Sequence, residues 1–138
     1  MNEQFENHTP NADDPQAPEP GALIREGYQA LSDNDVIQAG SCFKQALEID
    51  QQAVGAWRGL GKACESAELF DDAMFAFQQS LQIEPRHADT LRRVAAVHIQ
   101  AQQYKEAIHA LETCLDVEPD QSDTARALDL LKQHVAAR

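Results

Sequence analysis

The chain has few basic residues. Its 138 residues contain 11 Lys and Arg against 23 Asp and Glu, which gives a formal net charge of −12 at pH 7. Binding to nucleic acid requires a basic surface that displaces counterions from the phosphates, and anionic membranes attract basic segments. The charge balance therefore argues against both kinds of partner.

Long apolar runs are also missing. No stretch approaches the roughly 20 apolar residues that a membrane-spanning helix needs. The first ten residues, MNEQFENHTP, have neither the basic start nor the apolar core of a secretory signal. We therefore expect a cytoplasmic protein that does not insert into a membrane.

Sequence signals for catalysis or metal binding are equally scarce. The three cysteines form no C-x-x-C pair, and no Gly-rich phosphate loop or nucleophile elbow is present. Cys64 and His98 would lie on neighbouring packed helices, which are about 8–10 Å apart, too far for direct ligation of one zinc ion. We expect buried, reduced thiols, no metal or other cofactor, and no enzymatic activity.

Residues 1–19 differ in composition from the rest of the chain. They contain five acidic residues, three prolines and no Lys or Arg. Such a segment buries too little apolar surface to offset the conformational entropy lost on ordering. The composition predicts a disordered acidic tail ahead of the folded part.

The remainder of the chain repeats itself without gaps, at a fixed period of about 34 residues. Three sets of equivalent residues illustrate this: Ala39, Ala73 and Ala107; Phe43, Phe77 and Leu111; Ala46, Ser80 and Cys114. Pro85 and Pro119 end two of the copies, because proline cannot continue a helix. Internal repetition of this length indicates stacked supersecondary units.

Each copy reads as two amphipathic helices joined by a short turn. The copies span residues 20–53, 54–87 and 88–121, and a capping helix over 122–138 covers the apolar end of the stack. The expected helices are about 21–32, 36–49, 54–66, 71–83, 88–100, 104–117 and 122–136.

These repeats resemble the tetratricopeptide repeat (TPR) family. The family pattern of a bulky residue, Leu-Gly, an aromatic, then Ala, Phe, Ala and Pro is matched in the second copy by Trp57, Leu60, Gly61, Ala73, Phe77 and Pro85. The first copy departs from the pattern at Glu26 and Gln51, which replace the Leu and the Pro. The resemblance implies an all-α, right-handed α-solenoid of antiparallel helix pairs with seven helices.

The resemblance also implies a function. In the family, the first helix of each repeat lines a concave groove that holds a peptide segment of a partner protein. Carried over to this sequence, the peptide-binding groove residues are Ile24, Tyr28, Leu31, Arg58, Lys62, Arg92, Arg93, Ala96 and Ile99. We therefore expect a non-enzymatic protein-protein interaction adaptor.

Four of the eleven basic residues fall in this groove. Two interpretations of Arg58, Lys62, Arg92 and Arg93 are open. They form a positive strip beside an apolar end, suited to a partner segment with acidic and apolar residues, or they belong to an ordinary solvated helix face.

The kind of partner is also open. One TPR subset grips chaperone C-termini with a two-carboxylate clamp, but here only Arg93 matches the clamp positions, so this partner is disfavoured. A bacterial type III secretion chaperone for a translocator client is the second interpretation, a homo-oligomeric scaffold the third, and an enzyme the fourth. The acidic tail, anchored by Phe5, is a further candidate occupant of the groove in cis.

Overall fold

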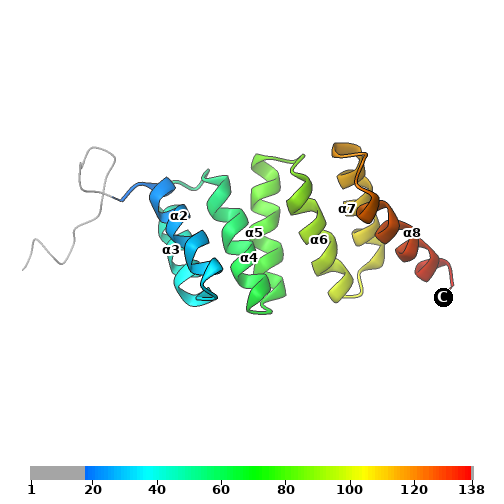
Figure 1. Ribbon diagram of the computed structural model, residues 1–138, viewed down its shortest axis with the longest axis horizontal. Helices are drawn as coiled ribbons and strands as arrows, with labels where there is room; N and C mark the ends of the chain where they lie inside the picture. The colour runs from blue at the N-terminus through cyan, green and yellow to red at the C-terminus, as the bar shows by residue number, and fades with distance from the viewer. Residues whose placement is uncertain (1–17, 138) are drawn as a thin grey trace, which may run out of the picture.

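The computed structural model describes residues 18–137, and within this range it consists of seven α-helices without strands. The helices form three antiparallel pairs followed by a single helix (Figure 1). They are α2 (Pro20–Ser32), α3 (Val36–Ile49), α4 (Val54–Ser66), α5 (Phe70–Ile83), α6 (Ala88–Gln100), α7 (Tyr104–Val117) and α8 (Ser122–Ala136). The predicted all-α solenoid is confirmed, and every predicted helix end agrees within one residue. The predicted acidic tail lies outside the described residues, apart from its last two.

The helix pairs stand side by side in one row, from α2 and α3 at one end to α8 at the other (Figure 1). Each helix packs against the next one in the sequence, and α2 also packs against α4. Stacking of this kind buries apolar surface that one pair alone would leave exposed. In the described range, no helix is long and apolar enough to cross a membrane.

The same turn joins the two helices of every pair. Its central residue has a left-handed backbone conformation at three positions that are equivalent by the repeat: Asn34 (φ 61°), Glu68 (φ 60°) and Gln102 (φ 59°). The next residue donates its backbone N–H to a carbonyl in the last turn of the first helix, as Leu69 does to Cys64 at 2.8 Å. This bond satisfies a carbonyl that the helix end would leave unpaired. Identical turns give the three pairs the same geometry.

Small residues and aromatic rings fill the contact between paired helices. In the first repeat, Gly27 faces the fully buried ring of Phe43, and a Cβ on this glycine would lie 2.6 Å from the ring. Gly61 and Phe77 repeat the arrangement. In the third repeat Ala95 and Leu111 occupy the equivalent positions of the core. The smaller Leu side chain leaves space for the alanine methyl group, so the two substitutions compensate each other.

The two ends of the stack are polar. On α2, exposed Arg25 and Glu26 stand where Gly59 and Leu60 of the second repeat contact the preceding repeat. On α8, exposed Asp129 stands where Gly27 and Gly61 receive an aromatic ring. A charged residue at these positions prevents another repeat from packing there. The capping role of α8 stays a prediction, and this polar surface supports it.

The cysteines only partly follow the prediction. Cys42 and Cys114 are buried and all three thiols are free. Cys64, in contrast, is only half-buried. Burial and the neighbouring Asp72 raise the pKa of Cys64, although Lys44 acts in the opposite direction. This thiol therefore stays protonated at neutral pH.

Candidate functional site

The first helices of the three repeats share one continuous surface, here called the inner surface. The Tyr28 hydroxyl of α2 donates to the Gly55 carbonyl of α4 at 3.3 Å. The Lys62 ammonium of α4 lies 5.3 Å from the centre of the Tyr28 ring and 3.7 Å from Asp89 Oδ2 of α6. One line of contacts therefore joins α2, α4 and α6.

The N-terminal end of the inner surface is apolar. Ile24, Tyr28 and Leu31 are half-buried and pack against the core around Phe43. The Tyr28 ring meets the Phe43 ring edge to face, with centroids 5.1 Å apart. Burial raises the pKa of Tyr28 despite the nearby Arg58 and Arg93 guanidiniums. This end therefore offers an uncharged contact surface.

The four basic residues lie together in the middle of the inner surface, and each of them pairs with a carboxylate. Arg58 pairs with Glu84. The other three pairs are Lys62 with Asp89 at 3.7 Å, Arg92 with Glu118 at 3.5 Å, and Arg93 with Glu65 at 3.2 Å. We call these eight residues the charged cluster.

Asp89 stands at the centre of the charged cluster. Besides Lys62, it accepts a hydrogen bond from Arg93 Nε at 3.2 Å and lies 4.0 Å from Arg92 Nη2. Burial alone would raise the pKa of Asp89, but Arg93, Lys62 and Arg92 together lower it below its ordinary value of 3.8. The side chain is consequently a carboxylate at neutral pH.

The charged cluster argues against the first of the two open interpretations, a positive strip. Its four cations face four carboxylates, so the middle of the inner surface has no excess positive charge. The sequence already indicated two of these ion pairs, because Glu84 and Glu118 are equivalent positions and each lies 26 residues after its arginine partner. The pairs of Arg92 and Arg93 leave about a third of the arginine side chain exposed. Ion pairs that solvent reaches contribute only about 0–1 kcal/mol each, and a ligand's charged groups can therefore replace one partner at small cost.

The C-terminal end of the inner surface is a cleft between α6 and α8. One part, about 250 Å³, is lined by Arg92, Ala96 and Ile99 on α6, Leu111 on α7, and Asp123, Thr124 and Ala127 on α8, with Ala95 at its base. A second part of about 400 Å³ shares Ile99 and Ala127 and extends to Leu130, Leu131, Tyr104 and His134. We call the two parts the α6–α8 cleft.

The sequence prediction missed the contribution of α8 to this cleft. Leu130 leaves 60% of its surface exposed there. A further shift by one repeat carries Ala96 to Leu130 and Asp89 to Asp123. The repeat period therefore places both residues at groove positions, as in a fourth repeat that has only its first helix.

The described part of the chain contains no cluster of metal-binding side chains. Among residues 18–137, no three His, Cys, Asp or Glu side chains come together in a way that could hold a metal ion. The arrangement consists of two apolar ends separated by a balanced charged cluster. Its chemistry suits non-covalent contact with another polypeptide.

Comparisons with known proteins agree with the fold. The sequence profile of the tetratricopeptide repeat family matches residues 66–133. No curated protein sequence matches the chain significantly. Residues 66–133 therefore belong to the tetratricopeptide repeat family, and the rest of the solenoid is built from the same kind of helix pair.

Solved structures with this fold include other TPR domains. The first TPR of Spaghetti (RPAP3), bound to the HSP90 peptide SRMEEVD, superposes with a TM-score of 0.81 at 17% identity, covering 86% of this chain and 94% of that one. The Arabidopsis OM64 TPR domain gives 0.78 at 16% identity, covering 83% and 95%. The MamA structure gives 0.81 at 18% identity, covering 85% and 68%.

Proposed function

We propose that this protein is a non-enzymatic interaction module that binds a polypeptide segment along its inner surface, from α2 through α4 and α6 to α8. The α6–α8 cleft is the observation that carries the proposal, because it leaves Ile99 and Leu130 exposed next to the charged cluster. The fitting ligand has apolar residues at both ends and charged residues between them. The charged side chains of the ligand replace one partner in ion pairs of the charged cluster.

The partner proposed here differs from the peptide in the Spaghetti (RPAP3) structure. That peptide, SRMEEVD, contains two glutamates and ends in an aspartate. In this chain Asp89 occupies the clamp position at which the family subset has a lysine, and Gly59 occupies a position at which it has an asparagine. A mixed-charge or apolar segment fits the balanced charged cluster better than an acidic C-terminus.

End-to-end oligomers are not favoured. Charged Arg25, Glu26 and Asp129 lie at the positions where another repeat would have to pack. The inner surface, in contrast, has its apolar ends open. We therefore propose a partner protein, rather than a second copy stacked on either end, as the ligand.

A blocked cleft tests the proposal. Dodecapeptides are selected from a random displayed library on the full chain, synthesised, and measured by fluorescence anisotropy. Replacing Ala127 with Gln fills the cleft and should weaken the binding of one class of these peptides at least tenfold. The matched control, Ala136→Gln, makes the same change at an exposed position of α8 that does not line the cleft. If every selected peptide binds both variants equally, the proposal is wrong.

A further inference from the structure

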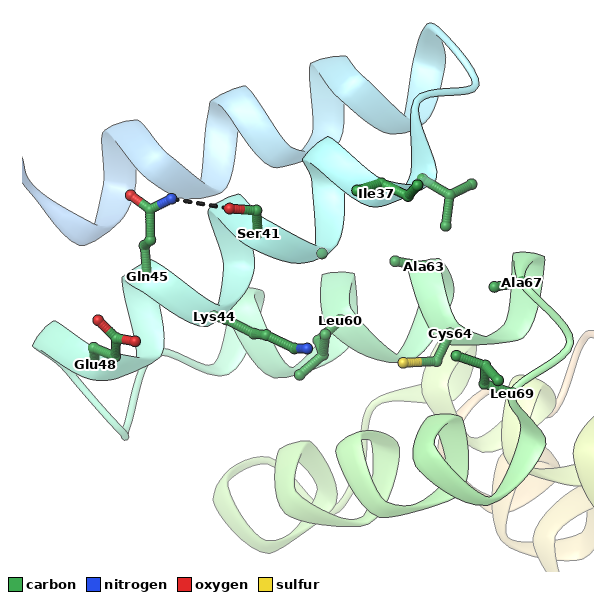
Figure 2. Close-up of a pocket in the computed structure, with 12 residues that line it drawn as sticks. Ile37, Ser41, Lys44, Gln45, Glu48, Leu60, Ala63, Cys64, Ala67 and Leu69 are labelled. Atoms are coloured by element: carbon green, nitrogen blue, oxygen red, sulfur yellow. Dashed lines mark hydrogen bonds between the residues drawn. The ribbon is translucent and has the colours of Figure 1, made fainter.

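A second pocket lies on the opposite side of α4 from the inner surface. It has a volume of about 580 Å³ and is lined by α3 (Val36, Ile37, Gly40, Ser41, Lys44, Gln45 and Glu48), by α4 (Leu60, Ala63 and Cys64), and by Ala67 and Leu69 between α4 and α5. At 100° per residue, positions 60, 63, 64 and 67 point away from positions 58, 62 and 65. Figure 2 shows α3 and α4 as its two walls, with Leu69 beside Cys64. We call it the outer pocket.

Gly40 is the residue that keeps the outer pocket open. A Cβ on this glycine would meet no atom within 4 Å, and its φ is not positive. Neither close packing nor backbone conformation therefore requires a glycine here, although glycine in a helix costs about 1 kcal/mol relative to alanine. The equivalent residues of the other repeats are Met74 and Ile108, which pack against the core. The first repeat lacks the side chain that fills this space in the others.

The residues at the rim of the outer pocket also differ from their equivalents in the other repeats. Ile37 is 88% exposed, whereas the equivalent residues are the charged Asp71 and Lys105. Leu69 is 52% exposed at the N-cap of α5 and forms no side-chain cap. Its equivalent Asp35 caps α3 by accepting from the Gln38 backbone N–H at 3.1 Å. Two exposed apolar residues thus stand where solvent contact favours polar ones.

The outer pocket also contains an available cation. Lys44 extends from α3 across the pocket toward Leu60 (Figure 2). It forms no ion pair with any residue in the described range, unlike the basic residues of the charged cluster. The equivalent residues are Gln78 and Glu112, so the positive charge is specific to the first repeat. The other charged residue of the lining is Glu48, at the far end from Leu69 (Figure 2).

We propose that the outer pocket is a second docking site, for a partner polypeptide that inserts one bulky apolar side chain over Gly40 and places a carboxylate against Lys44. Ile37 and Leu69 enclose the inserted side chain from the rim. The three departures from the repeat, at positions 37, 40 and 69, all enlarge the same pocket or make it more apolar. Because the pocket opens opposite the inner surface, both sites can be occupied together.

Filling the pocket without unfolding the protein tests this proposal. Gly40→Met restores the residue of the second repeat, and Gly40→Ala adds the same helix propensity but leaves most of the space free. Dodecapeptides are selected from a random displayed library on the full wild-type chain and measured as synthetic peptides on both variants. We expect a class that binds Gly40→Met at least tenfold more weakly than Gly40→Ala. These peptides should contain a bulky apolar residue with Asp or Glu within four positions.

Two further variants assign the binding mode. Lys44→Glu should weaken the binding of this class of peptides at least threefold. Ala127→Gln, which blocks the α6–α8 cleft, should leave the affinity for these peptides unchanged. The methyl NMR signals of Ile37, Leu60 and Leu69 should shift on binding, and those of Ile99 and Leu130 should not. Selected peptides that bind Gly40→Met and Gly40→Ala equally would overturn the proposal, as would an unchanged affinity for Lys44→Glu. If deleting residues 1–17 strengthens the class tenfold, the chain's own segment is the occupant and the partner assignment is wrong.

Discussion

Gly59 of α4 lies directly against the ring of Phe43 of α3, so that no side chain fits between them. A Cβ on Gly59 would lie less than 3.0 Å from three atoms of that buried ring. Phe43 also packs against Gly27 of its own hairpin. One phenyl ring therefore sets the spacing both within the first repeat and between the first and second repeats.

We predict that Gly59→Ala destabilises the protein. Overpacking a dense core costs about 1–3 kcal/mol, while the better helix propensity of alanine returns about 1 kcal/mol. The net result is a loss of up to about 2 kcal/mol in the free energy of unfolding, measured by urea denaturation followed by circular dichroism.

The same substitution at Gly40 should have the opposite sign. Since a Cβ at Gly40 meets open space, Gly40→Ala should raise the free energy of unfolding by about 1 kcal/mol. The two variants differ only in what surrounds the added methyl group. Equal stabilities of Gly59→Ala and Gly40→Ala would show that the close contact with Phe43 is not real.

Leu69 gives a second stability prediction. It occupies the N-cap of α5 without capping it, and half of its surface is exposed. Leu69→Asp should raise the free energy of unfolding by about 1 kcal/mol, because a carboxylate caps the first turn as Asp35 does for α3. Thermal unfolding measures the change, with Leu69→Ala as the variant that loses the side chain without gaining a cap. A fall in melting temperature for Leu69→Asp would mean that Leu69 contributes more to packing than a cap can replace.

The fold was predictable because the packing residues recur at a fixed period. The helix pair is predicted by the spacing of Gly61, Ala73 and Phe77. The same pattern, shifted by one repeat in either direction, extends the prediction to the whole solenoid. The turn at Glu68 was less evident, since a left-handed backbone favours Gly or Asn and the sequence offers neither there. At this turn the neighbouring packing determines the backbone conformation.

The sites were less predictable, because they depend on pairing between repeats and on empty space. Sequence alone placed Arg93 on the inner surface but not its contacts with Glu65 and Asp89. The outer pocket exists because Gly40 has no side chain to fill it. Such an empty space can be recognised in a sequence only when the repeats are compared position by position. Such a comparison of Gly40 with Met74 was the available signal.

Arg58 has a structural role that alters how the groove should be probed. Only 17% of its side chain is exposed, and it pairs with Glu84. Arg58→Glu would place two carboxylates together, so we expect a loss of about 1–2 kcal/mol in the free energy of unfolding. The double variant Arg58→Glu with Glu84→Arg should recover most of that loss in a double-mutant cycle. No recovery would mean that the pair does not form in solution.

The HSP90 peptide of the Spaghetti (RPAP3) complex is a direct negative control. We expect SRMEEVD to show no measurable binding to this chain by calorimetry at submillimolar peptide, because the carboxylate of Asp89 repels its acidic residues. Asp89→Lys should improve binding relative to wild type by removing that repulsion. Wild-type affinity in the micromolar range would contradict our description of the charged cluster.

Asp89 also predicts a pH dependence of stability. Its pKa in the folded protein lies below the ordinary value of 3.8, despite burial, because Arg93, Lys62 and Arg92 surround it.

The folded state therefore binds fewer protons than the unfolded state in this range, so the stabilisation is complete above about pH 5 and declines as the pH falls through about 4 and below. Asp89→Asn should flatten the stability curve in this window and lower neutral-pH stability by less than about 1 kcal/mol, because solvent reaches this half-buried carboxylate and screens its ion pairs. Urea denaturation from pH 3 to 7 measures both effects, and an NMR titration of the Asp89 carboxyl carbon checks the direction of the shift. Identical acid profiles for wild type and Asp89→Asn would show that the three cations do not hold this carboxylate in solution.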